Sequence, residues 1–589
     1  MKTKWYQLFG LLIVTVLLLT SCAPAAPQVV TVQETVEVIK EVEVEVEKVV
    51  EVEKGPVTNI WGKAMPVDAA PPEEQVLTLP CVEGKHMDIA ASFYETSKSC
   101  GAVFLWERLV MMDVNNKPVP GVATDWSLSE DGLTWTFNLR KDAKWSDGSP
   151  VTAGDFEYSL KRQLTPATGG SFTWFYSDIK NANKVVNGEV DPEELGVKAV
   201  DDYTLEITTE AKTLYLPEIM AFPTSAPVPK KVVEEVGANW SMDPATALSN
   251  GPWKMTKYEP GREIVLEPNE FYVGEHAPYI QKFIFKPSDG KNDFPAYQAG
   301  EVDGLFADQD ITPVTPVTYR YVKEDPNLRR ELYAFPYFAS RYIYVDPTVK
   351  PFDDIKVRQA LAHAIDRDAL IQVIYDGLGD PSYGLLPVGF PSYVPDALNQ
   401  YQELDVELAK SLLAEAGYPG GAGFPEIELA VKTDDETKVR TAEMVQAMFK
   451  ENLGIDIKLR PLDADIYNVE RGEGKIDFGI DNWEYDYVDP SNFLNIFNPN
   501  LGRHKDWNNA EYNELTEKAA GWDNPEERTK MYEDANELLS KEVGALFLYH
   551  WGHAQMWKPW VKGLSVNDLG YSRVPYYHLG MHNVYVTPK

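Results

Sequence analysis

Cysteine is scarce in this sequence, with 3 residues among 589, and that scarcity excludes a scaffold built on disulfides. Basic residues are in deficit, because 55 Lys and Arg stand against 91 Asp and Glu and give a formal net charge of −36. A surface that binds nucleic acid needs basic patches, so we expect no nucleic-acid partner. The only long apolar run lies at the extreme N-terminus, which excludes a protein with several membrane spans.

Motifs of the common enzyme classes are missing too: the sequence has no G-x-x-x-x-G-K-[ST], G-x-G-x-x-G, G-x-S-x-G or H-E-x-x-H. The densest histidine spacings are His550-x-x-His553 and His578-x-x-x-His582. A metal site would need further ligands and groups that orient them. We therefore expect no metal, no cofactor and no catalysis, and keep a secreted metal-dependent hydrolase using His550 and His553 as a distant alternative.

The N-terminus has the pattern of an export signal. Lys2 and Lys4 precede an apolar stretch over 8–19, and small residues follow immediately before Cys22. This segment resembles the bacterial lipobox, in which the cysteine is lipidated and becomes the mature N-terminus. We expect residues 1–21 to be a lipoprotein signal peptide and the exported protein to be lipid-anchored, at the outer face of the cell membrane or in the periplasm. An ordinary signal peptide with an incidental cysteine is the alternative.

Residues 22–59 follow as anchor and spacer. The Val/Glu-rich stretch over 28–54 alternates without turn residues, which predicts a low-complexity spacer, with a short coiled-coil stalk as the alternative. The other two cysteines are Cys81 and Cys100. In an exported chain a structural disulfide is the expected state for them, whereas a catalytic thiol would need a base and an electropositive pocket.

The body of the chain alternates strands and helices. Residues 133–139 alternate polar and apolar between turn residues and predict a strand, and Thr152 with Asp155 can cap a helix that runs to about Arg162. In the second half the patterns predict helices over 353–377, 405–417 and 438–452 and strands over 427–432, 455–459 and 476–483. This order indicates an α/β body with a parallel or mixed sheet covered by helices.

Aromatic residues are abundant, with 15 Trp, 31 Tyr and 23 Phe. Core packing accounts for most of them. Clusters at 174–176, 333–338, 483–487 and 549–551 exceed what cores usually need, and a large aromatic-lined ligand cleft would use them.

Several blocks of the sequence resemble one family. Residues 126–140, followed by Trp145-Ser-Asp-Gly-Ser-Pro-Val-Thr152, resemble the signature region of the oligopeptide/dipeptide solute-binding proteins of ABC importers. Further blocks follow in the family's order at 250–254, 263–269, 352–361, 364–368, 412–417 and 483–490. The resemblance covers roughly residues 75–565. It implies an α/β, periplasmic-binding-protein-like two-lobed fold of type II, the large peptide-binding class, with an extra domain inserted.

The resemblance also implies a domain division: lobe I from 60–119, 230–338 and 555–589, an extra domain at 120–229, and lobe II at 339–554. The implied function is capture of peptides between the lobes by hinge closure and delivery to an ABC permease, with a separate ATPase subunit and a monomeric receptor. A receptor of the same fold for oligosaccharides or another solute is the alternative, because aromatic walls suit sugars equally well.

Six positions match ligand contacts of the family: Asp486 for the peptide's α-ammonium group, Trp483 in a pocket wall, Glu484 in the strand segment that pairs with the peptide, Glu107 at the cleft edge, Arg471 for the terminal carboxylate of some ligands, and Tyr337 in the cleft. A seventh ligand-binding position carries Phe306, where the family has a tyrosine. Other departures are Ala464 for a pocket tryptophan and Ile480 for a cleft arginine. A family disulfide is absent, because its positions hold Ala339 and Glu484. Peptide length and side-chain preference are therefore open.

Overall fold

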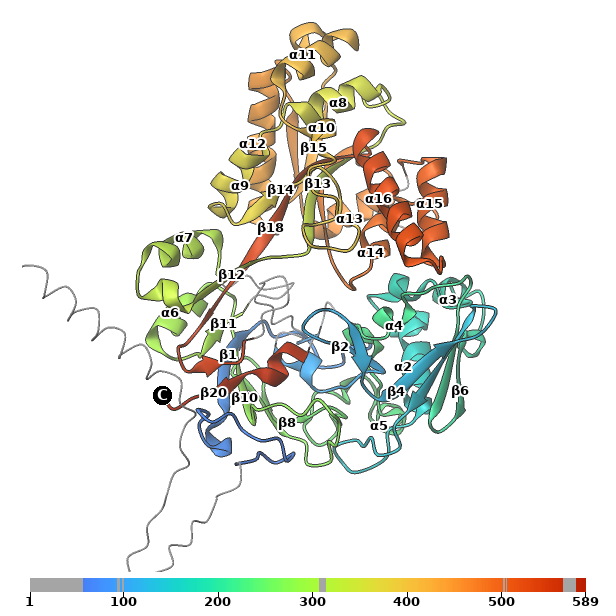
Figure 1. Ribbon diagram of the computed structural model, residues 1–589, viewed down its shortest axis with the longest axis vertical. Helices are drawn as coiled ribbons and strands as arrows, with labels where there is room; N and C mark the ends of the chain where they lie inside the picture. Colours follow the sequence, from blue (N-terminus) through green and yellow to red (C-terminus); the bar gives the residue numbers. More distant parts are fainter. Residues whose placement is uncertain are drawn as a thin grey trace, which may run out of the picture. The chain divides into compact units, whose positions relative to one another are not determined.

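The computed structural model describes residues 57–92, 96–97, 100–306, 314–501, 504, 506–564 and 579–589 (Figure 1). The predicted signal peptide, Cys22, the spacer over 28–54 and His578 lie outside these residues. Residues 59–589 form one compact unit. Of the helices described, none combines the length and the apolar character that a membrane crossing requires.

The first sheet has four strands in the order β1 (Val76–Cys81), β10 (Lys282–Pro287), β9 (Glu263–Pro268) and β8 (Trp253–Glu259). β1 runs parallel to β10 and the other pairs are antiparallel. Alternate residues such as Phe283 and Phe285 are buried, as the two-residue period of a half-covered strand requires. At the end of β1, Cys81 is joined to Cys100 by a disulfide with 5.0 Å between the Cα atoms.

A second, antiparallel sheet contains β4 (Ala123–Leu128), β5 (Thr134–Leu139), β7 (Thr204–Thr208) and β6 (Val197–Asp201). β5 confirms the strand predicted over 133–139. Helix α2 (Ala153–Leu164) packs on this sheet and begins with the predicted capping box, in which Thr152 and Asp155 bond each other's backbone N–H groups. One hydrophobic core joins the first and second sheets.

The third sheet, called the large sheet below, has the strand order β11 (Gly304–Leu305), β18 (Ala545–Trp557), β13 (Ala339–Val345), β17 (Phe478–Glu484), β15 (Glu428–Lys432) and β16 (Lys458–Leu462). β12 (Leu332–Pro336) and β14 (Gly379–Pro381) also pair with β18. β15 is parallel to β16 and β17, whereas β13 is antiparallel to β17 and β18, so the predicted mixed sheet is confirmed.

β18 connects two parts of the molecule. Its first half pairs with β13 and its second half with β12, and all of its residues are buried. The two faces of the large sheet carry separate cores. Ile343, Ile480 and Leu546 point to one face, and Tyr342 and Phe547 to the other.

The helix predicted over 353–377 is wrong as a single helix. The structure has α8 (Ile355–His363) and α9 (Arg367–Tyr375), because Asp366 accepts from the Ala369 N–H and starts a new helix. Asp405 caps α11 (Val406–Glu415), as predicted. α12 (Glu436–Leu453) is capped by Gly454. The strand predicted over 455–459 begins at Lys458, three residues after its predicted start.

The remaining helices are short or lie at the edges of these layers: α3 (Ala182–Val186), α4 (Leu216–Ile219), α5 (Lys230–Val236), α6 (Asp293–Ala299), α7 (Pro316–Glu324), α10 (Asn399–Gln402), α13 (Ala464–Gly472), α14 (Ser491–Leu494), α15 (Ala510–Ala520) and α16 (Pro525–Lys541). Two further strand pairs are β2 (Val110–Met112) with β3 (Pro118–Pro120) and β19 (Val561–Lys562) with β20 (Tyr585–Val586).

Candidate functional site

Strand β17 has different neighbours along its two edges. On one edge β13 pairs with it along its whole length, from Val345 and Phe478 to Ala339 and Glu484. On the other edge β15 pairs with it at Gly479 and continues beside β16. The Asn482 N–H, farther along β17, donates to a side chain, the Asp481 carboxylate, at 3.0 Å. The second half of β17 is thus joined to the sheet mainly through β13.

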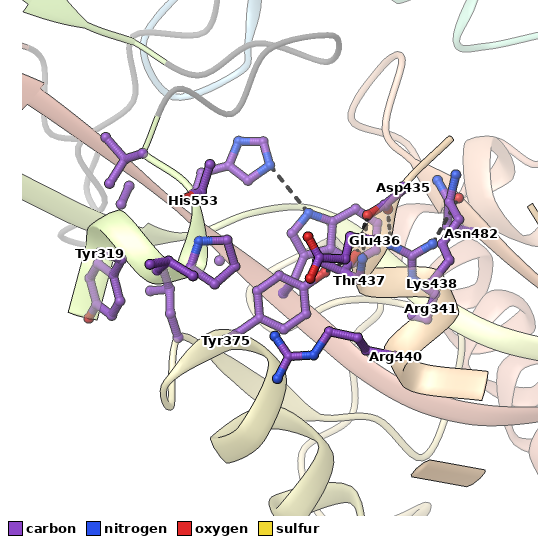
Figure 2. Close-up of a pocket in the computed structure, with 18 of the residues that line it drawn as sticks. Tyr319, Arg341, Tyr375, Asp435, Glu436, Thr437, Lys438, Arg440, Asn482 and His553 are labelled. Carbon is purple, nitrogen blue, oxygen red and sulfur yellow. Dashed lines mark hydrogen bonds and ion pairs between the residues drawn. The ribbon is translucent and has the colours of Figure 1, made fainter. Parts of the chain in front are cut away.

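A cavity of about 590 Å³ lies beside this half of β17 (Figure 2). Asn482 and Glu484 line it and share one face of the strand, because side chains two residues apart point the same way. The other walls come from the first turns of α12 and α7, from β18, and from the end of α9. Their lining side chains include Asp435, Lys438, Arg440, Val317, Tyr319, Tyr375, Trp551 and His553.

Arg341 on β13 is the buried cation of this cavity, with 3% of its side chain exposed. Its guanidinium lies 3.2 Å from the Asp435 carboxylate, donates to the Asn482 amide oxygen at 3.3 Å, and lies 4.9 Å from the Trp551 ring centre. Burial acts to lower its pKa, and the surrounding phenol groups with Asp435 more than reverse this, so the pKa stays above its ordinary value. Arg341 therefore ties β13 to the start of α12 as a permanent charge.

Asp435 serves both as ion-pair partner and as helix cap. Its carboxylate accepts from the Thr437 N–H at 2.8 Å and from the Thr437 hydroxyl at 2.6 Å. Burial acts to raise its pKa, but Arg341 and Thr437 outweigh burial and hold the pKa below the ordinary range. In the first turn of α12, Lys438 lies 3.3 Å from Asp434. Arg341, Asp435 and Lys438 are therefore held by partners within the protein before any ligand arrives.

Two histidines of β18 lie near the cavity as neutral rings. His553 accepts from the Trp551 indole N–H at 3.2 Å, as Figure 2 shows, and stacks on Tyr337 with 4.0 Å between ring centres. His550 is 3.1 Å from the Ala339 carbonyl oxygen. Burial lowers the pKa of each histidine to about 4. Within the described ranges, no three His, Cys, Asp or Glu side chains lie close enough together to hold a metal ion.

Trp483 and Asp486 are held together by one amide. The Asn492 side-chain oxygen accepts from the Trp483 indole at 3.2 Å and from the Asp486 N–H at 3.1 Å, while its NH₂ group donates to the Asp486 carboxylate at 3.1 Å. The Trp483 ring meets Trp174 edge to face at 5.6 Å. Trp483 alternates with Asn482 along β17 and so points to the face opposite the cavity.

Two other predicted ligand residues already have ionic partners in the protein. Glu107 is buried, lies 2.5 Å from the Arg140 guanidinium, and accepts from the Tyr272 hydroxyl at 3.0 Å. Arg471 lies 2.8 Å from the carboxylate of Asp481, which is almost fully buried. Neither lines the cavity, and their roles as ligand contacts stay predictions.

Of the other predicted positions, Glu484 lines the cavity and Tyr337 stacks on the cavity residue His553. Phe306 is buried and stacks on Trp557 with 6.2 Å between ring centres. The structure thus brings Glu484 and Tyr337 to the cavity, places Trp483 and Asp486 at the far end of β17, and leaves Glu107, Arg471 and Phe306 in other contacts.

The sequence analysis missed Arg341, Asp435 and Tyr375. Asp435 carries a usable signal, because an Asp just before a helix and just after a buried parallel strand is both a helix cap and a residue at the carboxyl edge of a sheet, where ligands bind in α/β proteins. Arg341 and Tyr375 carry no such signal, since Arg341 comes from the middle of β13 and Tyr375 from the end of α9.

Known proteins resemble this chain over most of its length. The sequence model of the bacterial extracellular solute-binding proteins, family 5 (middle region), matches residues 117–504. The periplasmic oligopeptide-binding protein OppA of Escherichia coli K12 is 31% identical over 471 residues, which cover 79% of this chain and 85% of OppA.

Comparison with solved structures leads to the same group of binding proteins. The unliganded open form of the periplasmic murein tripeptide-binding protein MppA matches with a TM-score of 0.73 at 28% identity, over 89% of this chain and 99% of MppA. Haemophilus influenzae OppA in complex with the peptide RPPGFSPFR matches with a TM-score of 0.68 at 28% identity, over 88% of this chain and 99% of that one. The predicted periplasmic-binding-protein-like fold is confirmed, and the chain belongs to the bacterial extracellular solute-binding proteins of family 5.

Proposed function

We propose that this chain is the substrate-binding receptor of an ABC importer, and that it captures peptides and delivers them to a permease without turning them over. The observation that carries the proposal is the cavity beside the second half of β17, where β15 no longer runs alongside. An extended peptide can bind there as an added strand, with main-chain bonds for affinity and pockets for alternate side chains. The peptide ligands named for OppA and MppA support this ligand class.

Asp486 is the proposed partner of the peptide's α-ammonium group. The Asn492 amide fixes its carboxylate, so little ordering is needed when a ligand arrives. Asn482, at the cavity, comes four residues earlier, a span of roughly 13 Å if the chain is extended. A peptide that starts at Asp486 therefore reaches the cavity within about four residues.

The setting of this site is proposed as well. Residues 60–119, 230–338 and 555–589 form lobe I, 120–229 the extra domain, and 339–554 lobe II. The receptor is exported as a monomer, Cys22 carries the lipid anchor, and Cys81 and Cys100 are oxidised in the exported protein. Its partners are the permease and ATPase subunits of the importer.

A thermal-shift screen of the mature protein against peptide and oligosaccharide libraries tests the proposal. A ligand present at one hundred times its Kd adds about 2.7 kcal/mol to the free energy of unfolding, enough to raise the melting temperature measurably. We expect peptides with free N-termini to stabilise the protein and oligosaccharides to have no effect. Stabilisation by oligosaccharides alone would make the sugar receptor the better interpretation, and turnover of any bound compound would indicate an enzyme.

A further inference from the structure

The segment over 211–222, which includes α4, packs against the loop that follows β17 and against the end of α15. The Tyr215 and Tyr487 rings stack with 5.4 Å between centres and 13° between planes. The Leu214 N–H donates to the Ala520 carbonyl at 3.1 Å, and Lys212 forms an ion pair with Asp523. Figure 1 shows α4 next to α14, with α15 and α16 above. We call this contact the docking contact.

Carboxylates outnumber cations inside the docking contact. Asp489, in the loop after β17, binds the Arg528 guanidinium of α16 through both oxygens, at 2.7 and 3.0 Å. The Arg528 Nε–H donates to the Ala519 carbonyl at 2.8 Å, so this cation is already engaged. Asp178 and Glu218 come from the other side of the contact. Asp178 accepts from the Tyr215 hydroxyl at 3.0 Å.

Glu218 on α4 is the carboxylate of the docking contact that has an unpaired oxygen. Its Oε2 atom is buried and accepts no hydrogen bond from the residues that the structure describes. Burial, and then the negative charge of Asp489, raise the pKa of Glu218 to about 7, and a bond from its own backbone N–H and the charge of Arg528 offset this only in part. Burial also raises the pKa of Asp178. A buried carboxylate with an unpaired oxygen is costly when charged and cheap when protonated.

Among the residues that the structure describes, the other groups in the docking contact leave this balance unchanged near neutral pH. The phenols in the contact, on Tyr215, Tyr487 and Tyr532, have pKa values above the ordinary range because of burial, so they stay neutral. Strand β2 also packs on α4, and its residues, Val110–Met112, do not titrate. The charged groups are therefore Glu218, Asp178, Asp489 and Arg528, with the Lys212–Asp523 pair at the rim.

We propose that Glu218 takes up a proton when the docking contact forms, so that docking of α4 against Asp489 and α16 is favoured at acid pH. The coupling of this docking to ligand capture rests on the proposed function, because closure over a ligand would bring these two parts together. The sign follows from linkage. In the docked structure the pKa of Glu218 is about 7, and on undocking we expect Asp489 to move away and the solvated side chain to regain the ordinary 4.5. The preference for docking is then complete below pH 4.5 and is lost as the pH rises through 7.

The direct test measures docking without any ligand. Spin labels on Glu189→Cys and Thr529→Cys, two exposed positions on opposite sides of the contact, report the distance between them. The labelled protein is the mature chain with Cys22→Ser. We expect the docking equilibrium constant to fall roughly 40-fold in all between pH 5 and pH 7, as the uptake of one proton by a group with pKa values of 4.5 and about 7 requires. Glu218→Gln, which imitates the protonated form, should stay docked at both pH values.

Glu130→Gln is the matched control, since Glu130 is an exposed carboxylate on the same side of the contact. It should behave as the parent does. Distances that do not change with pH in the parent, or that change equally in Glu218→Gln, would overturn the proposal. Calorimetric titration with trialanine separates the two claims: if neither trialanine nor other peptides bind and the distances still respond to pH through Glu218, the peptide function fails and the proton-linked contact stands.

Discussion

Two of the places where the part of the chain around the large sheet meets the other described residues are built in different ways. At the first, β18 leaves β13 and continues beside β12, so main-chain hydrogen bonds run through the junction. At the second, the docking contact, a ring stack, an ion pair and one main-chain hydrogen bond join the two sides. A strand ladder cannot part without local unfolding, whereas a few isolated contacts between side chains and one main-chain bond can. The difference suits the first place to a hinge and the second to a surface that opens and closes.

Removing a buried ring from the β18 junction should give the largest effect. Phe547 on β18 is fully buried among the aromatic residues of one sheet face. Phe547→Ala should lower the free energy of unfolding by about 3–5 kcal/mol, because it removes transfer free energy and leaves a cavity. Urea unfolding measures the loss. Leu408→Ala, at an exposed position of α11, should change stability by about 0.5 kcal/mol or less, and an equal loss in both variants would contradict the assignment of β18 as the structural junction.

The link between Cys81 and Cys100 lies in the first sheet, away from both junctions. Its reduction, or the double change Cys81→Ser and Cys100→Ser, should cost on the order of 3 kcal/mol of stability. Peptide affinity should stay the same in the folded protein, because neither cysteine lines the cavity. Peptide mapping by mass spectrometry without reduction should recover the peptide that contains Cys81 linked to the peptide that contains Cys100. Two free thiols in the natively exported protein would remove the disulfide from the account.

Truncating the contact between Trp174 and Trp483 should give the smallest effect on stability. Trp174 is 45% exposed and meets Trp483 edge to face, a contact worth about 0.5–1.5 kcal/mol. Trp174→Ala should weaken peptide binding by up to about ten-fold while the free energy of unfolding changes little, since the contact forms when the two parts close. Calorimetric titration and urea unfolding of the same variant separate the two effects. A large stability loss with unchanged affinity would mean that the contact is permanent.

Sequence patterns predicted those elements whose ends are set by residues nearby in the sequence. The strand at β5 and the capping box of α2 follow from turn residues and from a cap three residues away. The break between α8 and α9 carries a local signal too, the Asp366 cap on the Ala369 N–H, and the prediction of a single helix overlooked it. Arg367 is buried there and donates to the carbonyls of Ser382 and Phe547, and these partners are close only in the folded sheet.

The site shows the same limit. The family resemblance led to Glu484, which lines the cavity, and its placement of Glu107 at the cleft edge stays a prediction. The structure pairs Glu107 with Arg140 and Tyr272, which lie 33 and 165 residues away in sequence. Arg341 and Asp435 meet across 94 residues, so neither residue's neighbours in the sequence reveal the pair. Charge partners that come from separate elements require the fold itself.

The measurement that tests peptide capture most directly is a calorimetric cycle on Asp486. Peptides with a free N-terminus and the same peptides with an N-acetyl cap are titrated into the wild type and into Asp486→Ala, with Asp486→Asn as the variant that keeps the side chain's size. Losing one partner of a buried charge pair costs about 2–5 kcal/mol, so free peptides should bind Asp486→Ala about 30-fold more weakly or worse. Acetylated peptides should bind the wild type poorly and lose far less on mutation. Equal losses for the two peptide forms would show that Asp486 does not bind the α-ammonium group, and would contradict the account.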